Sequence, residues 1–200
     1  MDKQNLDFVT VNSHKIHGPK GVGALYIRKG IKINPLLHGG GHEFGLRSST
    51  ENVPGIVGFA QAVKISSSND LKRIGNLRDF LIGSILKEIS NTKLNGANGN
   101  KRLCNNINIS FKNIEGESIG AYLNAAGISV STGSACSSKS LEPSHVLKAI
   151  GLSHLEANSS IRVSLSKYNT NEESEYFLKE LKKTVEKLRK ISPIDETKWR

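Results

Sequence analysis

The sequence predicts a mixed α/β chain in which short strands alternate with amphipathic helices. The first half is rich in glycine and holds two apolar runs typical of strands, at 7–11 and 24–28. Two segments, 52–66 and 71–89, repeat apolar residues at helical spacing. From about residue 90 the pattern alternates strand, helix, strand, loop, helix, strand and helix, which is typical of a compact α+β or α/β domain.

Glycines are concentrated in the segment 15–60, where we expect the backbone to turn sharply or to approach a ligand closely. The segment 66–70 is predicted as a loop between the two helices, with Asn69 or Asp70 as the N-cap of the second. Six apolar residues of that second helix form a stripe that we expect to be buried: Leu71, Ile74, Leu77, Leu81, Ile82 and Ile85.

The second half begins with a polar loop at 91–102 and a strand at 107–111, where apolar and polar residues alternate. The remaining elements are predicted in this order: a helix over 115–127 with Gly127 as its C-cap, a short strand over 128–131, a loop over 132–144, a helix over 146–151, a strand over 159–166 and a long helix over 171–190.

Composition narrows the class of protein. The 200 residues suffice for one domain or two small ones with a buried core, and the 36% hydrophobic content excludes a disordered tail. No apolar run approaches the roughly 18 residues of a membrane span, and the polar start MDKQNLDF predicts no secretory signal. Two cysteines, Cys104 and Cys136, exclude a disulfide scaffold. We therefore expect a cytoplasmic protein with no membrane partner.

The chain carries 28 Lys and Arg against 18 Asp and Glu, a formal net charge of +10. Such a balance suits nucleic acid, anionic small molecules or acidic proteins. The basic residues are dispersed, and no repeated basic–aromatic pattern indicates base stacking. A solvated basic surface is therefore favoured over a nucleic-acid face.

Lys15 and Cys136 are candidate nucleophiles. Lys15 lies between a predicted strand and a glycine-rich turn, a setting that can desolvate an amine and suits a Schiff-base lysine; a solvated surface lysine is the alternative. Cys136 lies among small polar residues, where we expect an exposed thiol on a mobile loop; a chance surface cysteine is the alternative. Cys104 is predicted to be a small buried side chain beside a strand.

Arg162 is the candidate anion-binding residue. It is flanked by apolar residues in the strand 159–166, and an arginine on an inward face requires an anion such as a carboxylate; the alternative is the solvent face. His38, His42 and Glu43 contain ligand atoms for a metal, but the three glycines between the histidines disfavour the helix that would align them. We therefore predict no metal site.

Five segments together resemble a known family: HKIHGPKGVGALYIR, HGGGHEFGLRSSTENVPGIVGFAQA, SVSTGSACSS, LEPSHVLKAIG and SSIRVSLS. They resemble the NifS/IscS-type cysteine desulfurases, pyridoxal 5′-phosphate (PLP) enzymes of the class V aminotransferase group with fold type I. The segments follow the family order and cover nearly all of the chain. The resemblance implies the C-terminal part of the large PLP-binding domain, with its connecting helix, over 1–88. The small C-terminal domain with the catalytic-cysteine loop would occupy 89–200.

The resemblance implies roles for residues around the cofactor. Lys15 matches the lysine that holds PLP, and His14 matches a residue close to the cofactor phosphate. Thr50 matches the threonine that reaches the phosphate of the neighbouring subunit's PLP. The family usually has serine three residues before the lysine. Here that position is Asn12, followed by Ser13, and both are candidates for contact with the phosphate.

The resemblance also implies the reaction. Arg162 matches the arginine that binds the carboxylate of L-cysteine. Cys136 matches the cysteine that takes the sulfur as a persulfide, leaving L-alanine. The sulfur would pass to an acceptor protein for iron–sulfur cluster assembly or thiolation. Family members are about twice this length, and their N-terminal half supplies further contacts to the PLP ring and phosphate. The resemblance implies a homodimer, a separate N-terminal-half chain, or both as partners.

The chain therefore resembles a C-terminal half, which leaves a split enzyme with a separate N-terminal chain, a truncated product or a fragment as possibilities. Three other readings of function stay open. One is a non-enzymatic remnant or subunit, and another is a related PLP lyase or aminotransferase such as a selenocysteine lyase. The third is a basic nucleic-acid-binding module, which no motif supports.

Overall fold

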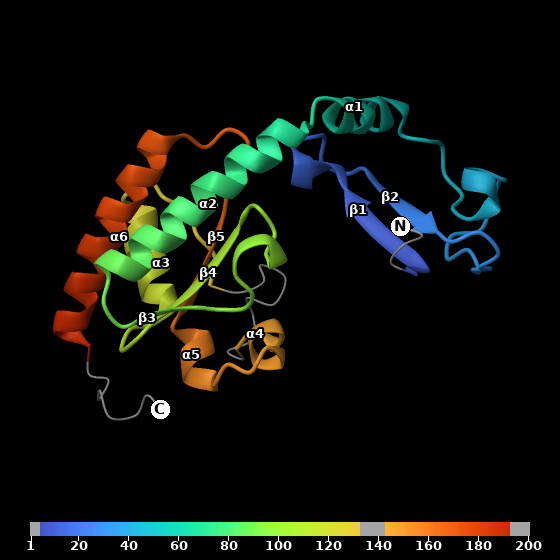
Figure 1. Cartoon of the computed structure of the whole chain (residues 1–200). Helices are drawn as coiled ribbons and strands as arrows, with labels where there is room; N and C mark the ends of the chain where they lie inside the picture. Colours follow the sequence, from blue (N-terminus) through green and yellow to red (C-terminus); the bar gives the residue numbers. More distant parts are fainter. Residues whose placement is uncertain (1–4, 133–142, 193–200) are drawn as a thin grey trace. The chain divides into compact units, whose positions relative to one another are not determined.

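The computed structural model describes residues 5–132 and 143–192 (Figure 1). Its contacts divide the chain into two compact units, 1–67 and 68–200. Within the described ranges, no helix is long and apolar enough to cross a bilayer. The contacts group the helix after residue 67 with the second unit, whereas the boundary predicted from the sequence follows that helix. The domain assignment of 1–88 and 89–200 stays a prediction.

The first unit contains an antiparallel hairpin of β1 (Phe8–Asn12) and β2 (Gly23–Ile27), which confirms both predicted strands. A 3₁₀ turn, η2 (Ser13–Ile16), continues directly from β1, and a second, η3 (Glu43–Gly45), lies at the opposite end of the hairpin (Figure 1). The unit closes with α1 (Val53–Lys64), which packs against η2.

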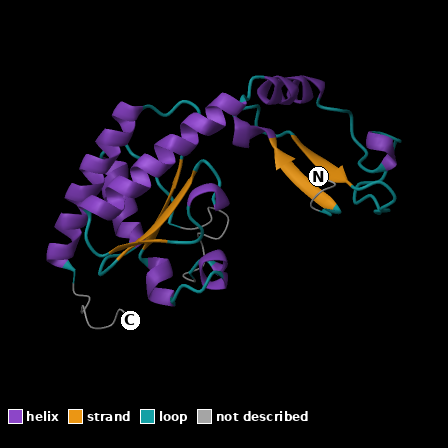
Figure 2. Ribbon diagram, in the orientation of Figure 1, coloured by secondary structure: helices purple, strands orange, loops and turns teal. Residues whose placement is uncertain are grey.

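The second unit contains a three-stranded antiparallel sheet in the order β3 (Thr92–Leu94), β4 (Asn106–Phe111) and β5 (Ser160–Ser164), seen in Figure 2. Long helices cover one face of this sheet: α2 (Ser68–Glu88), α3 (Gly116–Ala125) and α6 (Asn171–Ile191). Three short helical elements complete the unit: η4 (Gly99–Lys101), α4 (His145–Ala149) and α5 (His154–Asn158).

The alternation of side chains along β4 explains the two different faces of the sheet. Ile107, Ile109 and Phe111 are at most 1% exposed and belong to the core beneath the long helices. The residues between them, Asn108 and Ser110, point to the other face, where α5 contacts β4. One face therefore builds the core. Burial of each large apolar side chain there stabilises the fold by about 1.5–3 kcal/mol. The opposite face is left for polar groups.

Most predicted elements of the second unit are confirmed, including the helix that ends before Gly127. Gly127 has a left-handed backbone (φ 77°) and donates its N–H to Asn124 O, as expected of the residue that ends a helix. The predicted loop 66–70 is wrong at its end, because α2 already begins at Ser68. The predicted strand 128–131 is reduced to a single bridge at Ser131.

One strand and one α-helix of the second unit were not predicted from the sequence. β3 is only three residues long and lies inside a segment predicted to be a loop. α5 is also short, although its start carries a capping box in which Ser153 and Glu156 each bond the other's backbone N–H. That Ser-x-x-Glu spacing was the signal that could have identified α5.

Candidate functional site

Lys15 lies on η2, directly after β1. Its side chain and that of His14 are exposed. The turn is fixed by two backbone hydrogen bonds, from Ser13 N to Val22 O (3.1 Å) and from Gly18 N to Ser13 O (3.0 Å). The amine of Lys15 is therefore presented to solvent on a short, pinned segment of backbone.

Ser13 lies on the same turn but faces inward. It is 0% exposed, and its Oγ has no hydrogen-bond partner among the described residues. A Cβ at Gly18 would lie 2.1 Å from that Oγ and 3.0 Å from Ala62 Cβ on α1, so only glycine fits there. Ser13 was predicted to contact a phosphate, and in the structure its Oγ is buried beside Gly18.

Asn12 and Thr50, the other two predicted phosphate contacts in this unit, are both exposed. Asn12 ends β1 immediately before the turn, and the backbone of Gly23 lies opposite it in the hairpin. Thr50 follows the glycine-rich loop that contains η3, where Ser48 Oγ donates to Gly40 O (2.6 Å). Asn12 therefore directly precedes the turn that carries Lys15, whereas Thr50 belongs to a different loop.

A cavity of about 400 Å³ lies on the polar side of the sheet in the second unit. Arg162 from β5, Arg102 and Lys101 line it together with His145, the first residue of α4. None of the described residues that line the cavity is acidic. The rest of the lining includes the apolar side chains of Leu103, Val146, Leu147 and Ile150. The cationic groups and N–H donors within this lining suit an anion.

Arg162 is exposed, and its side chain lines this cavity rather than the core. Its guanidinium has no ion pair within the described ranges. The backbone of Arg162 exchanges two hydrogen bonds with Ser131, and Thr132, the next residue, also lines the cavity. The arginine is therefore held at its backbone while its charged end stays available to a ligand.

Arg102 has a different role in the same cavity. Its Nε donates to Ala97 O (2.7 Å), one terminal nitrogen donates to Asn106 Oδ1 (2.7 Å), and the other donates to Asn95 O. Burial, and then the nearby charge of Arg78, lower the pKa of Arg102. These bonds hold the loop around η4 against β4, so Arg102 fixes part of the lining of the cavity that Arg162 also lines.

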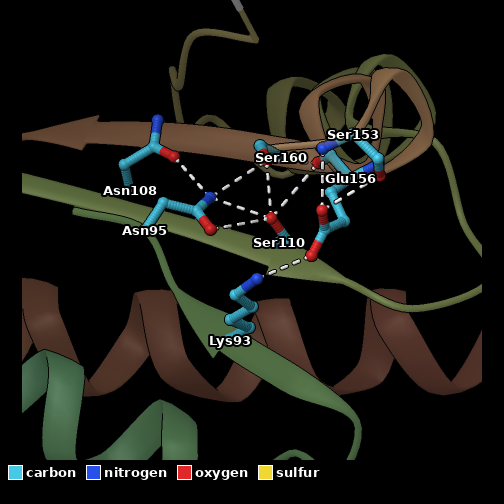
Figure 3. A network of polar contacts seen from close by, with 7 residues as sticks. All are labelled: Lys93, Asn95, Asn108, Ser110, Ser153, Glu156 and Ser160. Carbon is cyan, nitrogen blue, oxygen red and sulfur yellow. Dashed lines mark hydrogen bonds and ion pairs between the residues drawn. The ribbon is translucent and has the colours of Figure 1, made fainter. Parts of the chain in front are cut away.

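A polar network lies behind the cavity, between the sheet and α5 (Figure 3). Ser110 Oγ and Ser160 Oγ are 2.8 Å apart, Ser160 Oγ donates to the Glu156 carbonyl of α5 at 2.6 Å, and Ser110 Oγ lies 3.2 Å from the same carbonyl. The Glu156 carboxylate pairs with Lys93 Nζ at 2.7 Å, and this hydrogen bond lowers the pKa of Glu156. Asn95, 3% exposed, connects the serines to the cavity wall.

The two cysteines differ in what the structure describes. Cys104 is half-buried and packs against the core of the second unit, close to the prediction. Cys136, the predicted sulfur-accepting residue, lies outside the described residues. No group of three His, Cys, Asp or Glu within the described ranges has a geometry that could hold a metal ion.

Sequence reasoning found Arg162 but missed the asparagines and Arg102 around it. Asn95, Arg102 and Asn108 come from three segments that meet only through the register of the sheet. The alternation of asparagine and isoleucine at 106–109 was the available signal, because it places both asparagines on one face.

A family model and individual relatives of this chain agree on its family. Residues 1–177 match the family model "Aminotransferase class-V". "Cysteine desulfurase IscS" from Dictyoglomus turgidum is 49% identical over 100% of this chain and 51% of its own length. "Cysteine desulfurase IscS 1" from Archaeoglobus fulgidus is 48% identical over 97% of this chain and 51% of its own length.

Solved structures agree with the sequence relatives. A "NifS-like protein" matches with a TM-score of 0.80 and 40% identity, covering 94% of this chain and 48% of that one. A NifS-like protein from Rickettsia africae matches with a TM-score of 0.80 and 32% identity, covering 92% and 49%. The chain thus spans about half the length of the relatives it matches.

Proposed function

The chain belongs to the class V aminotransferase family, with cysteine desulfurases as its relatives, and on that basis we propose that it acts in a PLP-dependent cysteine desulfurase. The proposed reaction removes sulfur from L-cysteine and gives L-alanine. The cavity beside Arg162 carries the proposal, because it offers a free guanidinium and no acidic side chain among its described residues. That lining suits the carboxylate of an amino acid.

The residues at η2 fit an aldehyde cofactor with a phosphate. Lys15 offers an exposed primary amine, and Asn12 and His14 beside it offer side-chain N–H groups for a phosphate. When bound, PLP supplies the electron sink for chemistry at the carbons of an amino acid. Lys15 would hold the cofactor and then move a proton as a base once its amine is released. Thr50 would contact the phosphate of a neighbouring subunit's PLP in a dimer.

Arg162 would bind the substrate carboxylate and thereby orient the rest of L-cysteine. Its planar guanidinium can donate two parallel hydrogen bonds to a carboxylate, which fixes direction as well as position. Since its backbone is held by Ser131, binding has to order only the Arg162 side chain and not the strand that carries it.

Cys136 would accept the sulfur. One C–S bond of L-cysteine breaks and one S–S bond forms on Cys136, while the substrate carbon gains a proton to give L-alanine. Atoms and electrons balance without an external oxidant. Cys136 follows Thr132 by four residues, so a covalent reach of at most roughly 14 Å separates their Cα atoms. This reach lets the chain bring Cys136 to a substrate bound in the cavity.

The persulfide would then pass to a thiol of a sulfur-acceptor protein, for iron–sulfur cluster assembly or thiolation, in the cytoplasm. A persulfide is a reversible modification, so transfer regenerates Cys136 for another cycle.

A second candidate function is that of a subunit that does not turn over substrate by itself. Two features of the first unit favour it. Its described sheet has only two strands, which alone are marginally stable in water. Large apolar side chains in its loops are exposed, including Phe44 at 98% and Leu36 at 91%. We propose that an N-terminal half, on the same chain or on another, completes this sheet and covers such side chains.

The experiment is release of L-alanine from L-cysteine in the presence of PLP, with the chain co-expressed with an N-terminal half of a cysteine desulfurase. Lys15→Ala is the matched variant, and Lys20→Ala, five residues away and also exposed, is the control. Alanine release that requires Lys15 but not Lys20 supports the desulfurase. A complex that binds PLP and releases no alanine supports the inactive subunit.

A further inference from the structure

Asn108 and Arg162 are direct neighbours across β4 and β5. Phe111 N donates to Ser159 O (2.8 Å), which marks Phe111 and every second residue of β4 as hydrogen-bonded positions. Asn108, three residues earlier, therefore faces Arg162 in a non-hydrogen-bonded pair. Side chains of such a pair lie on one face with Cβ atoms about 4.5–5.5 Å apart. Both residues line the cavity.

The orientation of the Asn108 amide is fixed from behind. Its Oδ1 accepts a hydrogen bond from Asn95 Nδ2 at 2.7 Å. Figure 3 shows the oxygen of Asn108 directed at Asn95 and its nitrogen turned away from the network. Since Asn108 lines the cavity and donates no hydrogen bond to a described residue, its N–H₂ group is available to a ligand.

Asn95 is itself held in a single orientation. Its Nδ2 lies 2.8 Å from Ser110 Oγ and 3.1 Å from Ser160 Oγ, and its Oδ1 accepts from Ser110 Oγ at 3.0 Å. Ser160 Oγ donates its single hydrogen to the Glu156 carbonyl at 2.6 Å, so the Ser160 oxygen can only accept from Asn95. A flip of the Asn95 amide would place its Oδ1 against the Ser160 oxygen, whose hydrogen is already donated, and against Asn108 Oδ1, so the orientation shown is favoured.

We propose that Asn108 Nδ2 donates a hydrogen bond to the substrate carboxylate beside Arg162, and that Asn95 is the positioning residue that keeps this nitrogen facing the cavity. The inference rests on the proposed function, since it names a second contact for the same carboxylate. Arg162 supplies the charge, whereas Asn108 supplies a neutral donor of fixed direction. Together they would recognise a planar carboxylate from two sides.

The test uses steady-state kinetics with L-cysteine in the co-expressed enzyme and equilibrium binding of 3-mercaptopropionate, a thiol with a carboxylate and no amine. Asn108→Asp keeps an oxygen for Asn95 Nδ2 and replaces the cavity-facing N–H₂ with a negative oxygen. We expect KM and the 3-mercaptopropionate Kd to rise about tenfold or more, the scale of a lost charge-assisted hydrogen bond, with a smaller change in kcat. Asn124→Ala, exposed on α3, is the control and should change neither.

Asn95 is tested by Asn95→Asp, which cannot donate to Asn108 Oδ1 and should raise KM through a rotated Asn108 amide. Asn108→Ala should raise KM by a similar factor and serves if Asn108→Asp does not fold. The inference is overturned if Arg162→Ala weakens binding of 3-mercaptopropionate while the Asn108 variants stay within twofold of wild type. If Arg162→Ala itself has no effect on this binding, the proposed function of the cavity is overturned instead.

Discussion

Ser131 and Arg162 exchange two backbone hydrogen bonds, of 3.0 Å from Ser131 N to Arg162 O and of 2.5 Å from Arg162 N to Ser131 O. This bridge ties the segment that precedes Cys136 to the strand that carries Arg162, the proposed carboxylate-binding residue. Cys136 follows Ser131 by five residues, a covalent reach of at most roughly 18 Å. The candidate sulfur acceptor and the candidate substrate-binding residue are therefore linked through one pinned backbone position.

Arg162→Ala should strongly raise KM for L-cysteine, because the variant loses a two-pronged contact with the carboxylate. Each charge-assisted hydrogen bond contributes roughly 1.5–3 kcal/mol, so a rise of at least about tenfold is expected. Arg162→Lys keeps the charge without the planar fork and should recover only part of the loss. Kinetics of both variants in the co-expressed enzyme provide the measurement, and unchanged values for Arg162→Ala would show that its side chain does not contact the substrate.

Cys136→Ser should abolish persulfide formation and leave the absorbance of bound PLP intact, because serine cannot hold the transferred sulfur. Mass spectrometry after incubation with L-cysteine detects the added sulfur. Cys104→Ser is the matched control: Cys104 packs against the core, so this variant should still form the persulfide. Persulfide on the Cys136→Ser variant would refute the role of Cys136 and redirect attention to Cys104.

Glu156 should make the stability of the chain depend on pH. The hydrogen bond from Lys93 holds the pKa of Glu156 below its ordinary 4.5 in the folded state. The stability that ionised Glu156 adds to the fold is therefore fully present above about pH 4.5 and is lost as pH falls through the lower, folded-state pKa. Glu156→Gln keeps the capping box and removes the charge. We expect wild type to be more stable than Glu156→Gln at pH 7, with the difference shrinking at low pH in denaturant unfolding. A difference that is independent of pH would contradict the assignment.

Leu81→Ala should destabilise the second unit by about 3–5 kcal/mol, because Leu81 is 1% exposed in the core cluster and its loss leaves a cavity. Leu71→Ala on the same helix is the control, since Leu71 is 57% exposed. Urea unfolding monitored by circular dichroism measures both. Equal losses in the two variants would mean that α2 buries a different face.

Periodicity in the sequence predicts the fold well where an element is long enough to repeat. The stripe of α2 is buried as expected at five of its six positions, and only Leu71, near the helix start, is exposed. β3 could not be found in this way, since three residues cannot establish an alternation and its pairing with β4 is set by tertiary contacts. The start of α2 at Ser68 was missed because the serines and asparagine there suit a loop or a cap equally well.

The candidate site was predictable only in part. Recognisable motifs contain Lys15, Arg162 and Cys136. In the structure the first two residues are exposed, and backbone hydrogen bonds hold the segments that carry them. The inward direction of Ser13 depends on α1 packing over Gly18, which no local pattern reveals. The pairing of Asn108 with Arg162 depends likewise on strand register, which joins residues 54 positions apart.

The most direct test of the central claim is release of L-alanine from L-cysteine, with added PLP, by the chain alone and by the chain co-expressed with an N-terminal half of a cysteine desulfurase. We expect poor solubility and little or no turnover for the chain alone. The co-expressed pair should turn over L-cysteine, and this activity should be lost in Lys15→Ala and in Cys136→Ser. Robust turnover by the lone, monodisperse chain would contradict the need for a second half, and a soluble pair that binds PLP but releases no L-alanine would contradict the desulfurase itself.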